Sequence, residues 1–269
     1  MINYNQICSK VQDTAREAGA FIAQERENFS FERVEFKGVH DMVSYVDKQA
    51  EKIIVTKLKQ LIPSSLFITE EDTPEAQAAT REAKIEGKKY TWIIDPLDGT
   101  TNFIHGLPPY CVSIALMEDD ELVVGVVYEI TLDEMFTAVK GEPAYLNGKQ
   151  IKVSNTKELD NSLISVGFTY DSDKEVEQMA EDLVFFQKHS HGARRIGSST
   201  ANVVYTACGR FDLFFKTNLK PWDVAAGALI AKQAGAIVED YSGGDNYIFG
   251  KQILCCTPHI YNEVKQRIR

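Results

Sequence analysis

The chain has 269 residues, of which 44% are hydrophobic and 25% are charged, and its formal net charge at pH 7 is −10. This length and apolar content suit one large domain or two smaller domains in close contact, and they argue against disorder of the chain as a whole. The negative net charge argues against a surface built to hold nucleic acid or anionic lipid, because both require clustered Lys and Arg side chains.

Residues 1–19 contain no basic segment followed by an apolar one, and no apolar run in the chain is long enough for a membrane-spanning helix. We therefore expect a soluble, cytoplasmic protein without a membrane partner. The five cysteines have no CxxC spacing. Reduced thiols fit this pattern better than a disulfide framework does.

The first half of the chain opens with two predicted helices. Apolar residues between positions 4 and 28 recur at intervals of three and four, which indicates an amphipathic helix. A second helix is predicted from Asp47, which can cap its N-terminus, to the residues just before Pro63. The segment between the helices is too irregular to assign, although the Lys37-Gly38 pair suggests a turn or loop.

Strands follow the second helix. Residues 65–69 predict a short buried strand, and the charged residues 73–89 are typical of a solvated surface segment. Another buried strand is predicted at residues 91–94. Residues 112–151 then alternate short strands with tight turns, including a hairpin at Asn147-Gly148, which indicates an antiparallel sheet.

The polar residues 152–162 predict a boundary between two subdomains, residues 1–152 and 153–269. Beyond the boundary, the patterns predict strands at 163–168, 211–215 and 236–240, and helices at 198–209 and 222–235. The chain is therefore predicted to be α+β, with an antiparallel sheet in the N-terminal half and a mixed sheet in the C-terminal half. Helices and sheets should alternate in layers.

Two aspartates, Asp95 and Asp98, follow the strand predicted at residues 91–94. Gly99 would allow a ligand close to the backbone, and Thr100 would open a helix whose free amide groups suit a phosphate. Each residue has an ordinary structural explanation when taken singly, because Asp before Gly is common in turns and Thr is a common helix cap. The combination points to a ligand site.

Glu70 and Asp223 also stand at the ends of predicted elements, where they could converge with Asp95 and Asp98. Two like charges about 4 Å apart repel by roughly 4 kcal/mol at an effective dielectric near 20, and bound cations would remove this penalty. Because all these ligands are oxygen atoms, Mg²⁺ is the favoured ion, with Mn²⁺ or Ca²⁺ as alternative occupants.

These residues carry a resemblance to a known family. The segments TEED (69–72), WIIDPLDGTTNFIH (92–105) and PWDVAAGALIAKQAGA (221–236) resemble the three defining motifs of the inositol monophosphatase family, whose members are Mg²⁺-dependent, lithium-sensitive phosphatases. The similarity extends over nearly the whole chain. It implies a layered αβαβα sandwich, an active site between the two halves, and a homodimer.

The resemblance also implies a role for single residues. The implied ligands of two or three Mg²⁺ ions are Glu70, Asp95, Asp98, Asp223 and the backbone carbonyl of Leu97. The implied catalytic residues are Asp47, Thr100 and Glu70, and the implied substrate contacts are Asp98, Gly99, Thr100, Ser199, Lys216 and Asp223. Lys37 matches a lysine near the active-site loop. Together they imply hydrolysis of inositol monophosphate, or of a related polyol or sugar phosphate, by a metal-activated water.

Lys216 departs from the family pattern, because inositol monophosphatases usually carry a glutamate there that contacts ring hydroxyl groups. The lysine could favour a second anionic group on the substrate, or it could point to solvent. Phosphatases of 3'-phosphoadenosine 5'-phosphate more often have lysine and glutamate where this chain has Thr101 and Asn102, which favours the inositol branch. That nucleotide and fructose 1,6-bisphosphate remain alternative substrates. A hypothesis of another class is a non-catalytic, metal-binding regulatory module.

Overall fold

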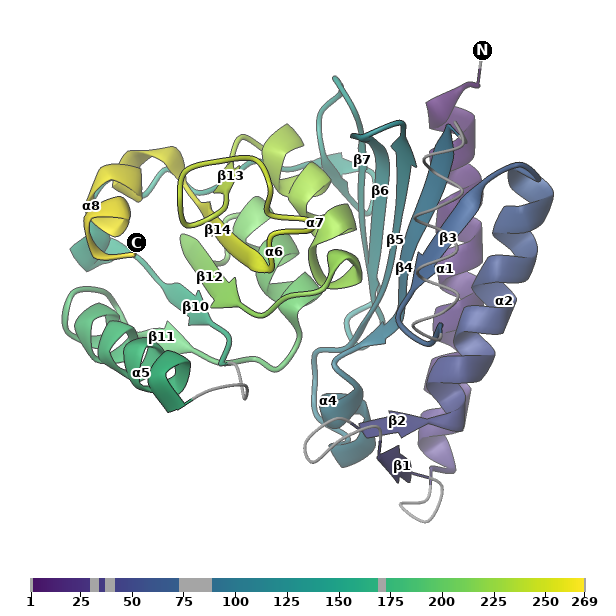
Figure 1. Cartoon of the computed structure of the whole chain (residues 1–269), viewed down its shortest axis with the longest axis horizontal. Helices are drawn as coiled ribbons and strands as arrows, with labels where there is room; N and C mark the ends of the chain where they lie inside the picture. Colours follow the sequence, from purple (N-terminus) through teal and green to yellow (C-terminus); the bar gives the residue numbers. More distant parts are fainter. Residues whose placement is uncertain (1, 30–33, 37–41, 73–88, 169–172, 269) are drawn as a thin grey trace.

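The computed structural model describes residues 2–29, 34–36, 42–72, 89–168 and 173–268. Its elements form five layers in the order helix, sheet, helix, sheet, helix, as Figure 1 shows. This arrangement confirms the predicted αβαβα sandwich.

The first layer consists of α1 (Tyr4–Glu27) and α2 (Tyr45–Leu61), which cover one face of a large sheet. The apolar side chains that predicted α1 are buried against that sheet, among them Val11, Ala15 and Ile22. The predicted start of the second helix is wrong, since α2 begins at Tyr45 and Asp47 lies in its first turn. Asp47 is therefore not the N-cap, and its buried carboxylate faces another element instead.

The second layer is a seven-stranded sheet with strands in the order β3-β4-β5-β6-β7-β8-β9. Its strands are β3 (Leu66–Thr69), β4 (Tyr90–Asp98), β5 (Cys111–Glu118), β6 (Glu121–Glu129), β7 (Glu134–Val139), β8 (Tyr145–Leu146) and β9 (Lys149–Gln150). The pairs from β4 to β9 are antiparallel, as predicted, whereas β3 runs parallel to β4. A long connection after β3 allows this exception, because a parallel pair needs a crossover and a tight turn cannot supply it.

The third layer contains α6 (Ser199–Ala207) and α7 (Pro221–Gln233), which lie between the large sheet and a second sheet (Figure 1). The second sheet has the order β11-β10-β12-β14-β13 and combines parallel and antiparallel pairs, which confirms the predicted mixed sheet. Its strands are β10 (Ile164–Val166), β11 (Ala193–Arg194), β12 (Leu213–Thr217), β13 (Ile237–Glu239) and β14 (Gln252–Cys256).

The last layer contains α5 (Asp173–Lys188) and α8 (Tyr261–Arg267). Shorter elements complete the described chain: the hairpin β1 (Val34–Phe36) and β2 (Met42–Ser44), the helix α4 (Thr100–His105), and the 3-10 turns η2 (Leu159–Asn161) and η3 (Pro258–Ile260). None of the helices in the described ranges is both long enough and apolar enough to cross a membrane.

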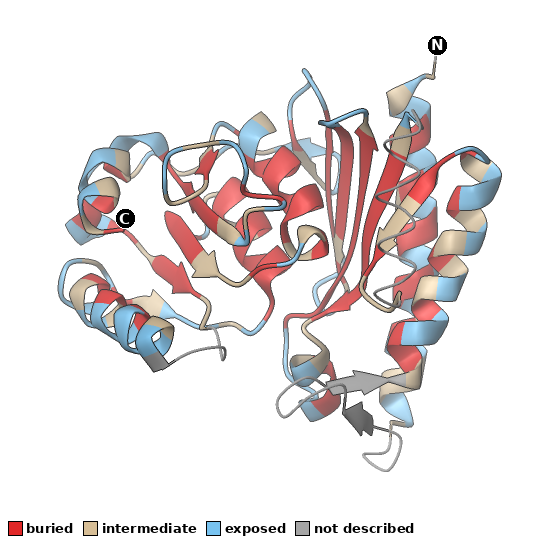
Figure 2. Cartoon of the chain, viewed as in Figure 1, coloured by how far each residue is buried: buried red, intermediate tan, exposed pale blue. Residues whose placement is uncertain are grey.

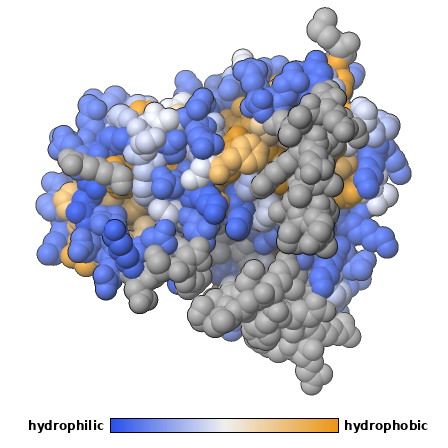
Figure 3. Space-filling model, in the orientation of Figure 1, coloured by the Kyte–Doolittle hydropathy of each residue, from blue (hydrophilic) through white to orange (hydrophobic). Residues whose placement is uncertain are grey.

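The buried apolar side chains of the described residues form three clusters: between the first helix layer and the large sheet, around the middle helices between the two sheets, and between the second sheet and the last helix layer. Figure 2 shows the central strands and helices as almost entirely buried. The middle cluster joins α6 and α7, from the C-terminal half, to the strands of the large sheet. The face in Figure 3 is mainly hydrophilic, with smaller hydrophobic areas. The predicted division at residue 152 follows β9, but the two halves share this middle cluster, so their division into two subdomains stays a prediction.

Candidate active site

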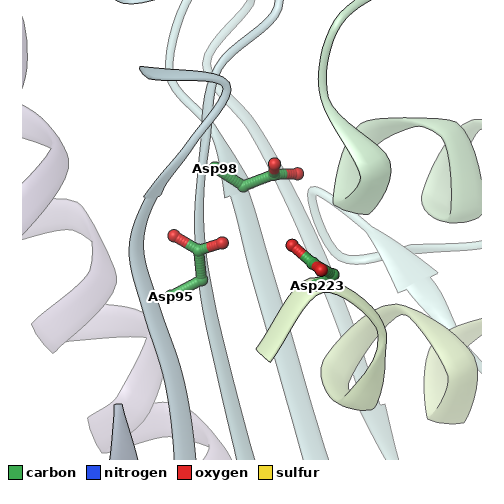
Figure 4. Close-up of side chains that lie close together, drawn as sticks. All are labelled: Asp95, Asp98 and Asp223. Atoms are coloured by element: carbon green, nitrogen blue, oxygen red, sulfur yellow. The ribbon is translucent and has the colours of Figure 1, made fainter. Parts of the chain in front are cut away.

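Asp95 and Asp98 lie near the C-terminal end of β4, and an irregularity in the strand brings their side chains together. On a regular strand, residues three positions apart point to opposite faces. Here Asp95 pairs with Ser113 and Asp98 with Cys111, so three steps along β4 match two steps along β5. This bulge adds a residue to β4, and both carboxylates consequently point to the same region (Figure 4).

The third carboxylate comes from the other half of the chain. Asp223 lies in the first turn of α7. Pro221 suits the start of this helix, because backbone amides in the first turn have no acceptor within the helix and proline has no amide proton to leave unpaired. Its side chain accepts a hydrogen bond from the backbone amide of Lys220 at 2.7 Å. One carboxylate oxygen from each of Asp95, Asp98 and Asp223 lies within 4.8 Å of the others, and Figure 4 shows the three groups turned toward one another.

The electrostatics of this cluster are unfavourable in the protein alone. Burial raises the pKa of Asp95 well above its usual range, and the negative charges of Glu70, Asp98 and Asp223 raise it further. Burial likewise raises the pKa of Asp223 to about 6, although the positive charge of Lys216 opposes this effect. Burial is the largest cause for both Asp95 and Asp223, so their charged forms are poorly solvated as well as close to other negative charges.

A divalent cation fits this donor set. The cluster offers several carboxylate oxygen atoms at short mutual distance, and such ligands suit hard ions such as Mg²⁺. Glu70 follows β3, which runs beside β4, and it is close enough to Asp95 to raise the pKa of that residue by hydrogen bonding as well as by charge. The four carboxylates singled out in the sequence are therefore neighbours in the structure.

Asp98 is fixed by residues at the start of α6. Its Oδ2 accepts hydrogen bonds of 2.6 Å from the Ser198 hydroxyl and from the Thr200 backbone amide. The Thr200 hydroxyl in turn donates to the backbone carbonyl of Asp223 at 3.1 Å. These contacts join β4, α6 and α7, so Asp98 and Asp223 are held in a fixed relation to each other.

Thr100 joins the cluster to α2. Its hydroxyl lies 3.0 Å from Asp47 Oδ1 and 3.0 Å from the carbonyl oxygen of Leu97. A hydroxyl has a single proton to donate and two lone pairs to accept with. When the proton goes to Asp47, which is fully buried, the lone pairs of Thr100 remain available to a further donor.

Gly99 precedes α4 with φ +96°, a conformation that L side chains rarely adopt. A Cβ at this position would lie 3.0 Å from the carbonyl oxygen of Pro109. The turn after Asp98 is therefore crowded as well as left-handed, and glycine satisfies both conditions. Without it, α4 and Thr100 could not follow Asp98 so closely.

A pocket of about 550 Å³ contains Ser198, beside Asp98, in its wall. Ser199 and Lys216 line it, and the Lys216 ammonium donates to the Ser199 hydroxyl at 2.8 Å. The two substrate contacts suggested by the sequence thus lie next to each other. Lys216 is half-buried and does not simply point to solvent.

Sequence reasoning missed three residues that support the site. Ser198 and Thr200 hold Asp98, and Asn102 donates to the carbonyl groups of Pro109 and Ile196 at 2.8 and 2.7 Å. The pattern of a serine before an apolar helix signals Ser198 as an N-cap, a role that it also fills by accepting from the Ala201 amide. The predicted role of Lys37 cannot be compared, because this residue lies outside the described residues.

Comparisons with known proteins identify one family. The model of the inositol monophosphatase family matches residues 4–268. The chain is 37% identical to an inositol monophosphatase of Dictyostelium discoideum over 98% of this chain and 96% of the relative. It is 41% identical to inositol monophosphatase 2 of Solanum lycopersicum over 92% of each chain. A putative Nus factor SuhB of Neisseria meningitidis is 38% identical over 91% of each chain.

Solved structures show the same fold. The extragenic suppressor protein suhB of Bartonella henselae superposes with a TM-score of 0.88 at 32% identity and covers 98% of both chains. An IMPase of Thermotoga maritima superposes with a TM-score of 0.84 at 31% identity, covering 96% of this chain and 94% of the other.

Proposed function

The chain belongs to the inositol monophosphatase family, and from this premise we propose that it hydrolyses inositol monophosphate, or a related small polyol or sugar phosphate, with the help of Mg²⁺. As a member of this family it is a phosphoric monoester hydrolase, whose substrate is a small phosphorylated molecule. The proposed metal dependence rests on one observation: one carboxylate oxygen from each of Asp95, Asp98 and Asp223 lies within 4.8 Å of the other two.

Four carboxylates and one carbonyl would hold the metal ions. One Mg²⁺ would be bound by Glu70, Asp95 and the Leu97 carbonyl. A second would be bound by Asp95, Asp98 and Asp223. The site would hold two or three ions in all. When bound, Mg²⁺ supplies a Lewis acid that stabilises negative charge on the phosphoryl group and increases the acidity of a nearby water molecule.

Thr100 and Asp47 would orient the attacking water. Asp47 Oδ1 accepts the Thr100 hydroxyl proton across 3.0 Å, so a lone pair of Thr100 Oγ1 can accept a hydrogen bond from the water. As the water oxygen bonds to phosphorus, a water proton passes to Thr100 while the Thr100 hydroxyl proton passes to Asp47. The P–O bond opposite the water breaks, and the departing alkoxide takes up a proton from solvent. Every candidate carboxylate nucleophile is assigned to a metal ion, so we expect no covalent phosphoenzyme.

The turn after Asp98 would hold the phosphate. The backbone amides of Gly99 and Thr100 open α4, and amides at such a position donate well to phosphate oxygen atoms. Ser199 and Lys216 would contact the rest of the substrate from the adjoining pocket. Glutamate is the usual residue at the Lys216 position in the family, so fructose 1,6-bisphosphate and 3'-phosphoadenosine 5'-phosphate remain alternative substrates. We also propose that Li⁺ inhibits the enzyme. We further propose that the chain forms a homodimer, and sedimentation equilibrium can test this oligomeric state.

A regulatory role is the alternative of another class. A 38% identical relative bears the name putative Nus factor SuhB. A non-catalytic module would have no need of Thr100 and Asp47 beside the acidic cluster, and we therefore prefer the enzymatic function. The regulatory hypothesis gains support only if the purified chain releases no phosphate from any phosphomonoester.

The experiment measures phosphate release from myo-inositol 1-phosphate with Mg²⁺, with EDTA, and with added Li⁺. We expect turnover with Mg²⁺, loss of turnover with EDTA, and inhibition by Li⁺. In ¹⁸O-labelled water the label should enter the released phosphate without labelling the protein, and a trapped aspartyl phosphate would contradict the mechanism.

Asp223→Asn should abolish the Mg²⁺-dependent turnover and leave the protein folded. Asp13→Asn is the matched control, because Asp13 has the same side chain on the exposed surface of α1. Equal activity of the Asp223→Asn variant and the wild type would refute the metal assignment.

A further inference from the structure

The pocket beside the acidic cluster carries positive charge in a chain whose net charge is −10. Lys216, from β12, and Arg195, which precedes α6, both line it. Arg195 is exposed and stacks over the ring of Phe168, with its Cζ 5.8 Å from the ring centroid. A lysine on the pocket wall beside the acidic cluster calls for an explanation beyond the binding of the uncharged part of a polyol phosphate.

Among the described residues, the hydrogen-bond partner of the Lys216 ammonium is an uncharged group. Lys216 is half-buried, and its ammonium donates to the hydroxyl of Ser199 on the pocket wall. Hydrogen bonds between two charged groups are stronger than those to a neutral hydroxyl, so an anionic group of a ligand would be a better partner for this ammonium.

The backbone next to Lys216 is shaped to let its side chain reach the pocket. A Cβ at Gly167 would lie 2.5 Å from Lys216 Cδ and 3.0 Å from its Cγ. The methylene groups of Lys216 therefore pass directly over Gly167, in space that the side chain of any other residue at position 167 would occupy. Its ammonium ends at the Ser199 hydroxyl, 2.8 Å away, on the pocket wall. A lysine held by these neighbours has little freedom to turn toward solvent.

The same pocket offers an acceptor for a hydroxyl group. Asn202 is 2% exposed and lines the pocket, and its Nδ2 donates to the Ser198 carbonyl at 2.8 Å. Its Oδ1 is buried and has no hydrogen-bond partner among the described residues. Buried amide oxygens are normally paired, so this acceptor is suited to a hydroxyl group of a ligand or of water.

We infer that this pocket receives the second anionic group of a doubly phosphorylated substrate, which Lys216 binds with the help of Arg195, and that the preferred substrates are bisphosphates whose carbon skeleton carries hydroxyl groups. This inference rests on the proposed function and narrows its substrate class. One phosphate is cleaved at the acidic cluster, and the other remains on the product. Lys216 thereby determines specificity, and Gly167 is a positioning residue for it.

The test compares matched substrates that differ by one phosphate. The first pair is fructose 1-phosphate and fructose 1,6-bisphosphate, and the second is adenosine 3'-phosphate and adenosine 3',5'-bisphosphate. The measured quantity is the ratio of kcat/KM for the bisphosphate to kcat/KM for the monophosphate. We expect a ratio of about ten or more in at least one pair, since a charge-assisted hydrogen bond to phosphate contributes that much selectivity. The pair with the higher ratio shows whether the preferred bisphosphate is a sugar or a nucleotide.

Variants then assign the preference to Lys216. Lys216→Met should lower the ratio about tenfold to a hundredfold, mainly through KM of the bisphosphate. Gly167→Ala should lower it while keeping the lysine, because the new methyl group displaces the lysine stem. Lys216→Arg should retain part of the preference. Lys220→Met is the matched control, because Lys220 also acts on Asp223 but is exposed and not part of the pocket wall.

The outcomes separate this inference from the proposed function. Hydrolysis of the monophosphates with ratios near one in both pairs overturns the inference and leaves the phosphatase assignment intact. A ratio that Lys216→Met does not change, or that Lys220→Met lowers equally, also overturns it. Absence of phosphate release from all four compounds and from myo-inositol 1-phosphate, with Mg²⁺ present, overturns the proposed function itself and the inference with it.

Discussion

At the scale of single residues, the site depends on carboxylates whose negative charges repel one another. Asp95 is 1% exposed, and the pKa of its carboxyl group is raised by burial and by three other carboxylates. Functional sites often retain such destabilising groups because activity requires them. The metal-free protein should therefore be less stable than a variant with one fewer charge.

Asp95→Asn tests this expectation. The amide oxygen of the introduced side chain can still accept the hydrogen bond that Leu97 N donates to Asp95 at 3.0 Å. We expect the metal-free melting temperature to rise by about 2 to 4 °C, which corresponds to about 1 kcal/mol for a protein of this size. Phosphate release with Mg²⁺ should fall by at least about 10³-fold, because metal ions contribute several kcal/mol of transition-state stabilisation.

Differential scanning fluorimetry with and without Mg²⁺ provides the measurement. Asp13→Asn, on the surface of α1, should behave like the wild type in both respects. A lower metal-free melting temperature for Asp95→Asn, combined with an undiminished response to Mg²⁺, would show that Asp95 has a structural role only.

A second prediction concerns Glu51 in α2. Burial raises the pKa of its carboxyl group to about 7 from an ordinary value of 4.5, while the Glu71 backbone amide, 3.0 Å away, partly opposes the shift. A carboxyl whose pKa is higher in the folded state stabilises fully below the unfolded pKa, and this stabilisation is lost as pH rises through the folded pKa. Glu51 should therefore reduce stability increasingly between about pH 4.5 and pH 7.

Glu51→Gln should consequently raise the free energy of unfolding at pH 8 by about 1 to 2 kcal/mol, after allowance for solvent screening, and change it little at pH 4.5. Urea denaturation at the two pH values measures this difference. Glu27→Gln, at the exposed end of α1, is the control. An equal effect of Glu51→Gln at both pH values would contradict the shifted pKa.

At this scale the sequence was informative about residue types and less so about geometry. The carboxylates of Glu70, Asp95, Asp98 and Asp223 could be selected because each stands near the start or the end of a recognisable element. The bulge in β4 that brings Asp95 and Asp98 to one side has only a partial local signal, Pro96, which cannot donate a hydrogen bond to a neighbouring strand. Its register is set by pairing with β5. The contacts from Ser198 and Thr200 to Asp98 have no local signal, since they join segments about a hundred positions apart.

At the scale of elements, the position of α7 decides whether Asp223 reaches the other carboxylates. Gly125 in β6 allows this helix to approach, because a Cβ there would lie 2.7 Å from the Ala226 carbonyl oxygen. Gly125→Ala should push α7 away from the sheet and cost about 1 to 3 kcal/mol of stability. It should also weaken the stabilisation by Mg²⁺, because Asp223 moves with its helix.

Gly19→Ala separates these two effects. The added methyl group would lie 2.5 Å from Tyr128 Cε1, and Tyr128 packs in the cluster between α1 and the large sheet, away from α7. This variant should lose stability but keep the full increase in melting temperature on addition of Mg²⁺. A Gly125→Ala variant with an unchanged response to Mg²⁺ would show that α7 tolerates displacement.

Elements with strong periodicity were predictable, and those fixed by long-range packing were not. The α1, α6 and α7 helices and the antiparallel strands around Asn147-Gly148 follow from local patterns. By contrast, β14 was not predicted, although it pairs with both β12 and β13 in the second sheet. The parallel pairing of β3 with β4 was also missed, because strand direction depends on the crossover and not on the strand itself.

At the scale of the whole molecule, the layers bring the site together. The large sheet supplies Asp95 and Asp98, the middle helices supply Asp223 and the groups that hold Asp98, and α2 supplies Asp47 (Figure 1). The pocket with Lys216 lies where the second sheet meets this arrangement. The proposed metal ligands and the proposed specificity residue Lys216 therefore lie in different layers, so substitutions in β12 should alter substrate choice more than metal binding.

Divalent cations are proposed to bind between these aspartates, and the anomalous scattering of Mn²⁺ in a crystal of the wild-type protein tests this claim without relying on activity. An anomalous difference map should show peaks within about 2.0 to 2.6 Å of carboxylate oxygens of Asp95, Asp98 and Asp223, the range for hard cations with oxygen ligands. Strong Mn²⁺ peaks elsewhere in the molecule, with none among these three side chains, would contradict the claim.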